Sequence, residues 1–279
     1  HSLVNDRMSY ATERCLQELC PGEPYSIYEY GRREEISKIT PATLTRLHER
    51  VMREAPIEIF IVGDVRLEET ADIVGKAFRL PDRDPKPLPP TCVSGGKGKK
   101  PREIIETMDV DQGKLVMGGR TGVTWNDPDI FPLTYYNGIF GGFAHSKLFV
   151  NVRERDGMAY SAGSSLDNTK GLLLISAGID ASKYQDCIRV IQEEMSDMAE
   201  GKFSRDAFDK TRSLLIDRIH SREDSPSSRI GSFAEMLQNG NPLSTEEILR
   251  EISRVTPDDV VRVSSRVNLS TIYFLQKES

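Results

Sequence analysis

The sequence is poor in cysteine, with only Cys15, Cys20, Cys92 and Cys187 in 279 residues. No two of them form a Cys-x-x-Cys pair, and no regular spacing relates them. This excludes a disulfide framework and the usual cysteine-based metal sites. Free thiols are typical of a reducing compartment, so we expect a cytoplasmic protein.

Long hydrophobic runs and a strong charge of either sign are also absent. No run of about 18 apolar residues occurs, so we expect no membrane span, and no signal peptide is visible. The net charge is −6, whereas a nucleic-acid partner requires a concentrated basic face. The one basic cluster, "KGKKPR" at 97–102, lies among prolines and glycines and is typical of a solvated linker. We therefore expect neither a membrane nor a nucleic-acid partner.

Catalytic motifs are missing as well. None of His1, His48, His145 and His220 has a partner at metal-ligand spacing, and neither His-Glu-x-x-His nor its inverse, His-x-x-Glu-His, occurs. There is no Gly-x-Ser-x-Gly elbow, P-loop or dinucleotide fingerprint. No residue is therefore assigned to a metal or to a catalytic step.

A proline- and glycine-rich stretch divides the chain. Residues 81–101 hold six prolines and three glycines with little apolar content, which indicates a linker. We place the linker at 86–101, between a shorter part, 1–85, and a longer part, 102–279.

The two parts share a pattern that predicts an internal repeat. "ISKITPATLTRLHERV" at 36–51 matches "ISRVTPDDVVRVSSRV" at 252–267, and each contains a helix start with threonine as N-cap followed by proline. Each helix leads into an expected strand, 57–63 or 270–276. A Thr-Pro start alone could be coincidence, but the apolar faces also match, which favours common ancestry. The expected buried residues are Leu44, Leu47 and Val51 in the first copy and Val260, Val263 and Val267 in the second.

The longer part has the pattern of a complete unit. Expected strands come in adjacent pairs, at 102–110 with 114–122 and at 158–166 with 171–180, and expected helices follow in blocks. This order predicts an α+β fold, a mostly antiparallel sheet with helices packed on it, rather than a doubly wound parallel sheet. The first copy of the repeat is then partial and the second complete.

Arg153 and Tyr160 are the candidate binding residues. A helix carrying Arg153 passes through a turn at 155–157 into a strand carrying Tyr160. A guanidinium and a phenol can both donate hydrogen bonds to a peptide carbonyl or to the oxyanion formed when it is attacked. The alternative is that Arg153 pairs with Glu154 or Asp156 at the surface and that Tyr160 packs in the sheet.

Residues 141–161, "GGFAHSKLFVNVRERDGMAYS", resemble the second-domain signature of the insulinase, pitrilysin and mitochondrial processing peptidase family of zinc peptidases. Residues 23–44 and 57–78 resemble first-domain segments of that family. Two departures occur, with Lys147 where the family has arginine and Glu23 where it has histidine before Pro24. With Glu23 at this position, the sequence resembles a bacterial subgroup whose members are often described as probable or inactive proteases.

The resemblance implies two homologous α+β domains around a peptide-binding chamber, with Arg153 and Tyr160 as a substrate-binding pair. It also implies that zinc comes from a parent polypeptide or a partner, because the inverse zinc motif is absent. We expect this chain alone to be inactive. The favoured interpretation is a noncatalytic portion or subunit that helps to bind extended peptide beside a homologous zinc-bearing domain. The alternatives are the later part of an active zinc protease and a purely structural subunit.

Overall fold

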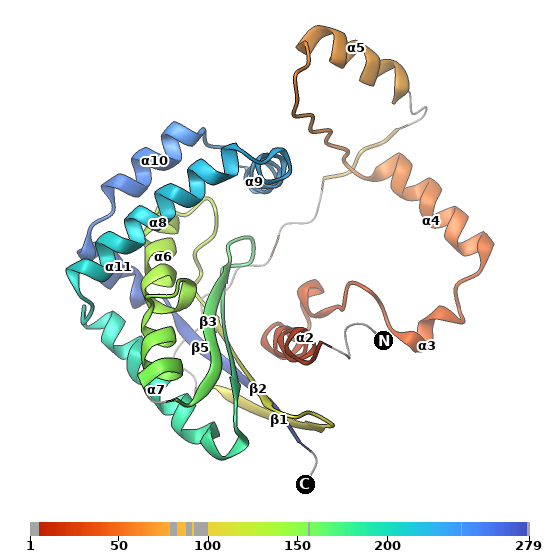
Figure 1. The fold of residues 1–279 in the computed structure, drawn as a ribbon. Coiled ribbons are helices and arrows are strands. Elements are labelled where there is room, and N and C mark those ends of the chain that lie inside the picture. The colour runs from red at the N-terminus through yellow and green to blue at the C-terminus, as the bar shows by residue number, and fades with distance from the viewer. Residues whose placement is uncertain are drawn as a thin grey trace.

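The computed structural model describes residues 6–78, 83–87, 91, 100–155, 157–240 and 242–277. Its centre is one five-stranded mixed sheet with the order β1-β5-β2-β4-β3 (Figure 1). One pairing, β1 with β5, is parallel and the other three are antiparallel, which confirms the α+β class and the mostly antiparallel sheet. The strands are β1 (Arg102–Met108), β2 (Gly113–Arg120), β3 (Ala159–Asp167), β4 (Leu172–Ile179) and β5 (Asn268–Lys277).

The position of each strand follows from its composition. β2, β4 and β5 are apolar on both faces and occupy the middle of the sheet, where helices or loops cover both faces. β1 and β3 alternate more exposed residues and form the two edges. β5 lies between β1 and β2, so Ile272 is opposite Glu103 on one side and Met117 on the other.

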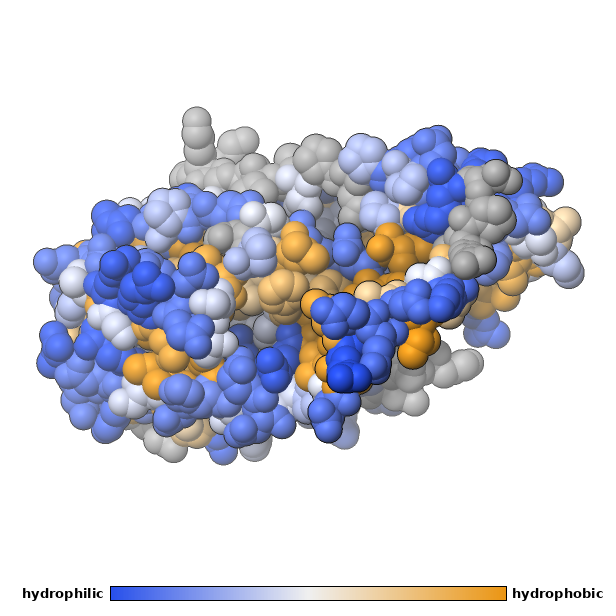
Figure 2. All heavy atoms as spheres, turned by 90° about the horizontal axis from the view of Figure 1, so that it is seen from above, coloured by the Kyte–Doolittle hydropathy of each residue, from blue (hydrophilic) through white to orange (hydrophobic). Residues whose placement is uncertain are grey.

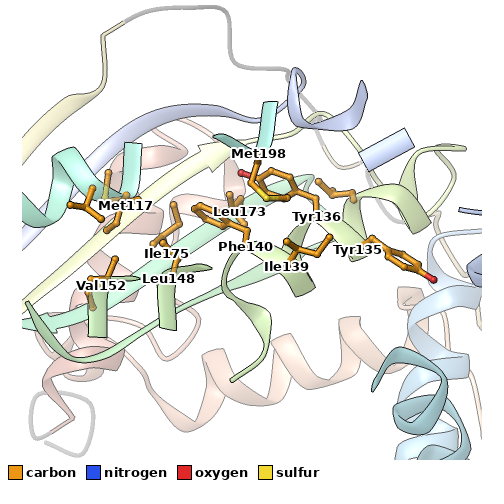
Figure 3. Close-up of a cluster of buried hydrophobic side chains, with 14 of the residues drawn as sticks. Met117, Tyr135, Tyr136, Ile139, Phe140, Leu148, Val152, Leu173, Ile175 and Met198 are labelled. Atoms are coloured by element: carbon orange, nitrogen blue, oxygen red, sulfur yellow. The ribbon is translucent and has the colours of Figure 1, made fainter. Parts of the chain in front are cut away.

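A helical layer covers one face of the sheet. Side chains of β2 and β4, including Met117, Leu173 and Ile175, pack in one buried cluster with Phe140 and Leu148 (Figure 3). None of the described helices is both long and apolar enough to cross a membrane. The helices of the longer part are α6 (Ile130–Asn137), α7 (Tyr184–Ala199), α8 (Arg205–Glu223), α9 (Pro226–Gln238), α10 (Thr245–Arg254) and α11 (Pro257–Ser264), with short π-helices at Gly138–Gly142 and Leu148–Arg155.

Helix α2 (Arg7–Leu19) covers the opposite face (Figure 1). The Asp6 carboxylate accepts a hydrogen bond from Ser9 N (3.1 Å) and caps the helix. Ala11 and Cys15 pack against Val116 and Tyr273 of the sheet. Burial raises the pKa of the Cys15 thiol to about 12, so this cysteine is an inert core residue. Cys15, Cys20 and Cys187 are free and buried, whereas Cys92 lies outside the described residues.

A buried charge cluster holds the end of α2 to the sheet. Glu23, just before the short 3-10 helix Pro24–Ser26, accepts hydrogen bonds from Arg120 Nη2 (2.7 Å) and from Lys170, which is 2% exposed. Burial alone would raise the pKa of Glu23, but the two cations outweigh it and hold the pKa below its usual value. Glu23, one of the two departures from the family pattern, thus joins segments 147 positions apart.

Residues 27–78 extend away from the sheet (Figure 1). They contain α3 (Arg33–Ile36), α4 (Pro41–Glu54) and α5 (Leu67–Ala77). The predicted N-caps are confirmed, since Thr40 accepts a hydrogen bond from Thr43 N (3.2 Å) and Thr256 accepts one from Asp259 N (3.3 Å). Both helices begin with the expected proline.

The predicted buried face of α4 is wrong. Leu44, Leu47 and Val51 are 57%, 45% and 48% exposed, whereas the matching Val260 and Val263 of α11 are fully buried. The strand predicted at 57–63 is also wrong, because these residues pair with no described strand. Both errors have one cause, since α4 has no sheet beneath it and a strand forms only beside a neighbour that accepts its ladder hydrogen bonds.

The predicted linker, 86–101, falls mostly outside the described residues. Just before it, Arg83 donates hydrogen bonds to the Met52 and Ala55 carbonyls (2.8 and 2.5 Å). Residues 83–87 therefore lie against the C-terminal end of α4.

The π-helix Leu148–Arg155 is fixed to α7 by a buried ion pair. Lys147 Nζ lies 2.5 Å from Glu194 Oε2, and the side chains are 15% and 8% exposed. Asn151 donates a hydrogen bond to the other carboxylate oxygen of Glu194. Lys147, the other departure from the family pattern, is therefore a structural residue here.

We expect Glu23→Gln to lower the free energy of unfolding at pH 7 by about 3 kcal/mol, because it removes the carboxylate charge that faces the buried cations of Arg120 and Lys170. The folded-state pKa of Glu23 is below its unfolded value. Its contribution is therefore present above the usual carboxyl pKa and is lost as pH falls through the folded value. Urea unfolding at pH 7 and at about pH 3.5 checks this. An equal difference between wild type and variant at the two pH values would contradict it, and Glu193→Gln in an exposed pair is the control.

Lys147→Ala leaves the buried Glu194 carboxylate without its main cation, so we expect the free energy of unfolding to fall by about 3 kcal/mol. Thermal unfolding followed by circular dichroism measures the change. Lys202→Ala is the matched control, because Lys202 also bonds two carboxylates but its side chain is 59% exposed. We expect no measurable change in Tm for the control, and equal losses in the two variants would show that the buried pair adds nothing.

Candidate functional site

A close approach of two backbones positions the candidate site. A Cβ atom placed on Gly141 would lie 2.7 Å from the backbone nitrogen of Ser164 in β3, so no larger residue fits there without a shift. Gly141 is thus the point where the π-helical extension of α6 meets β3. The helix Leu148–Arg155 begins six residues after Gly142.

The predicted helix, turn and strand are confirmed around residue 157. Gly157 has φ +54°, a left-handed conformation that glycine adopts without strain. Met158 N donates a hydrogen bond to the Val152 carbonyl (3.0 Å), which closes the turn. β3 begins two residues after Gly157, at Ala159.

Arg153 and Tyr160 lie at the surface on either side of this turn. Tyr160 is 76% exposed on the edge strand β3, so its packing inside the sheet is excluded. Arg153 is exposed, and its Cζ lies 4.5 Å from the centroid of the Phe149 ring. Among the described residues, no direct contact joins Arg153 to Tyr160. The alternative pairing of Arg153 with Glu154 or Asp156 involves side chains outside the described residues.

These two side chains can donate hydrogen bonds but cannot activate water. General bases that activate water are most often histidine or carboxylate side chains, and this pair contains neither. In the part of the chain that the structure describes, no three His, Cys, Asp or Glu side chains are grouped to hold a metal ion. The described residues therefore do not fit a zinc site, and no catalytic step through zinc follows from them.

Two of the cavities beside α8 adjoin the candidate site or residues 59–62, and no sequence pattern indicates them. A larger one, about 810 Å³, has residues 59–62 on one side and residues of α8, α9 and α10 on the other. Apolar surface is visible in this hollow when the molecule is viewed from above (Figure 2). A second cavity of about 390 Å³ is lined by Ser164, Ser165 and Leu166 of β3 and by residues of α6 and α8–α10. Both form from residues distant in sequence, so no local pattern could predict them.

Relatives of known sequence resemble nearly the whole chain. "Probable inactive metalloprotease YmfF" of Bacillus subtilis is 29% identical over 275 residues, which cover 99% of this chain and 64% of the relative. "Uncharacterized zinc protease Mb2805c" of Mycobacterium bovis is 29% identical over 242 residues, covering 84% of this chain and 54% of the relative. The chain thus spans less than two thirds of these relatives.

Solved structures and a protein family match as well. The crystal structure of a conserved protein from Enterococcus faecalis V583 superposes with a TM-score of 0.88 at 28% identity, covering 99% of this chain and 65% of that one. Residues 38–215 match the family described as the peptidase M16 inactive domain. Because that match includes well over half of the chain, the protein belongs to the peptidase M16 inactive-domain family.

Proposed function

We propose that this chain binds an extended peptide along the outer edge of β3, with Arg153 and Tyr160 donating hydrogen bonds to the peptide. The observation that carries the proposal is the exposure of Tyr160 on an edge strand, with an exposed arginine on the other side of the turn that precedes it. Both side chains donate hydrogen bonds that fit the carbonyl groups of a peptide.

The edge of β3 supports this mode of binding. β3 pairs with β4 on one side and, within the described residues, with no strand on the other. An open edge can accept a peptide as an added strand through main-chain hydrogen bonds. Ser161, Gly163, Ser164 and Ser165 give this strand small side chains, so a peptide backbone can approach it closely.

The proposed role is noncatalytic, because a peptide held here still requires an activated water. We propose that zinc and its general base belong to a homologous unit, carried either by the same parent polypeptide or by a partner subunit. The names of the relatives, one a probable inactive metalloprotease and the other a zinc protease, are compatible with both arrangements.

We also propose that residues 1–85 are the later part of a first repeat and that its missing part is the homologous unit. Aligned on the strand that follows each helix, Ile59, Phe60, Ile61 and Val62 match Ile272, Tyr273, Phe274 and Leu275 of β5. The β5 residues are at most 2% exposed, whereas Ile59, Ile61 and Val62 are 36–47% exposed. A segment that is apolar on both faces is typical of a central strand.

The size of the missing unit also fits. The match to the Bacillus subtilis relative leaves about 155 of its residues uncovered, since 275 residues are 64% of its length. Residues 102–255 of this chain, which supply the neighbours of β5, form a unit of that size. The missing unit would add one parallel and one antiparallel strand beside 57–63, as β1 and β2 do beside β5.

For the peptide site, we expect Arg153→Ala and Tyr160→Ala each to weaken binding of a fluorescent, unstructured peptide by about tenfold or more, as expected for losing one charge-assisted or directed hydrogen bond. Fluorescence anisotropy gives the Kd. We expect no hydrolysis of a fluorogenic peptide by the chain alone with added zinc. Turnover by the chain alone would refute the noncatalytic role.

Two control variants match the exposure of the site residues. Tyr30 is 79% exposed and lies far from β3 in sequence, and Arg205 stacks on Phe208 as Arg153 stacks on Phe149. Tyr30→Ala and Arg205→Ala should leave the Kd unchanged. If Arg153→Ala and Tyr160→Ala also leave it unchanged, a purely structural role for the chain is favoured instead.

For the missing unit, we expect backbone amides of 57–63 to exchange rapidly with deuterium in this chain alone, while those of 271–275 are protected by the sheet. Co-expression with the part of the Bacillus subtilis relative that this chain leaves unmatched should protect 57–63. Ile59→Glu with Ile61→Glu should abolish that protection without changing the Tm of the chain alone. Protection of 57–63 in the chain alone would contradict the proposal.

A further inference from the structure

We propose that the cavity beside β3 binds the C-terminal carboxylate and terminal apolar side chain of the bound peptide, with Arg218 and Arg222 recognising the carboxylate. The inference rests on the proposed peptide site and adds the class of peptide that it selects. It comes from the position of the cavity, its unpaired cations and an unsatisfied polar atom.

The cavity has the size and lining of a small-molecule or side-chain pocket. Its volume of about 390 Å³ is within the range of ligand sites. Trp125, Phe131 and Leu166 line one part, and Leu215 and Met236 line another. Leu215 and Met236 are buried in the folded chain. A leucine-sized side chain would therefore find an apolar surface to contact.

The charges at this cavity favour an anion. Arg218 and Arg222 lie one turn apart on α8, both line the cavity, and neither has an ion-pair partner among the described residues. Arg218 instead stacks on the Phe143 ring, with its Cζ 4.8 Å from the centroid. The one carboxylate in the lining, Glu235, accepts a hydrogen bond from Trp125 Nε1 (3.2 Å). Two guanidinium groups against one carboxylate leave a net positive charge.

Arg222 shows the effect of this arrangement. Its side chain as a whole is exposed. Even so, loss of water around the guanidinium lowers its pKa, and repulsion by Arg218 lowers it further, while Glu235 acts in the opposite direction. A carboxylate bound between the two arginines would remove this repulsion and could accept a hydrogen bond from each.

An unsatisfied acceptor points to a peptide rather than to a simple acid. Asn168 lines the cavity, and its buried Oδ1 has no hydrogen-bond partner in the described part of the chain. Buried acceptors without partners are rare, and a turn of this side chain toward the cavity would let Oδ1 accept a hydrogen bond from the N–H of a terminal peptide unit. A fatty acid has a carboxylate and an apolar chain but no N–H.

The cavity also lies within reach of a peptide that is bound beside Tyr160. Tyr160 and the lining residue Ser164 are four positions apart on β3, or about 13 Å at about 3.3 Å per residue. A peptide strand beside Tyr160 therefore reaches the cavity about four residues further on. To place its C-terminus there, the peptide must run in the same direction as β3.

Trp125 is the only tryptophan of the chain and lines the cavity, so its fluorescence reports occupancy directly. The probes are a tryptophan-free hexapeptide ending in leucine with a free C-terminus, the same peptide amidated, and octanoate. We expect the free peptide to change Trp125 emission in a saturable manner and the amidated peptide to bind at least tenfold more weakly. Equal binding of the two peptides, or no emission change with either, would overturn the proposal.

Variants distinguish the proposed carboxylate site from the proposed binding of the peptide along β3. Arg222→Gln should remove the preference for the free carboxylate while the amidated peptide still binds, whereas Tyr160→Ala should weaken both peptides equally. Arg229→Gln is the control, because Arg229 lies on α9 and lines only the larger cavity. If Arg222→Gln leaves the preference for the free over the amidated peptide intact, the proposed carboxylate site is wrong. The proposed binding of a peptide along β3 is not contradicted by that result. If octanoate binds as tightly as the free peptide, the cavity is a fatty-acid site and the peptide assignment is wrong.

Discussion

Every strand must place its backbone N–H and C=O groups in hydrogen bonds, and this requirement separates the two parts of the chain. β5 meets it because β1 and β2 lie on its two sides, and its apolar side chains are then buried on both faces. Residues 57–63 have the same kind of sequence but lack both neighbours, so they form no strand and their side chains stay partly exposed. The exposed apolar face of α4 and the missing strand at 57–63 both follow from the lack of neighbouring strands.

Charge pairs hold peripheral segments to the five-stranded sheet. Glu23 joins α2 to the ends of β2 and β4 through Arg120 and Lys170, and Glu194 joins α7 to the helix before β3 through Lys147. Such pairs contribute little when exposed, but a buried partner that loses its counter-charge is costly. Both departures from the family pattern, Glu23 and Lys147, lie in these pairs. In this structure both residues have a structural role, since each joins two segments of the chain.

What the sequence predicts correctly depends on short-range patterns. The threonine caps of α4 and α11, the glycine turn at 157 and the five strands within residues 102–279 were all predictable, because each signal lies within a few residues. The burial of Leu44 and the pairing of 57–63 were not, since they depend on elements outside the helix or strand itself. The Glu23–Lys170 contact and the cavity beside β3 join residues far apart in sequence, and no periodicity encodes them. Arg153 and Tyr160 could be named from the residues as hydrogen-bond donors on either side of a turn, but their spacing alone favoured a surface ion pair and a packed tyrosine, and only the family resemblance favoured a substrate role.

The arrangement of the proposed binding residues has a consequence for how such a chain could cooperate with a catalytic unit. An edge strand holds a peptide in a fixed register, because main-chain hydrogen bonds repeat along it. If the C-terminus is anchored between Arg218 and Arg222, the peptide bond that lies beside Tyr160 is about four residues from the end, set by about 3.3 Å per residue along β3. The hydrogen-bond donors of Arg153 and Tyr160, together with a carboxylate site at Arg218 and Arg222, would then determine which peptide bond is presented to the catalytic unit. The choice of bond would be made on this chain, and its cleavage would be left to the unit that supplies the activated water.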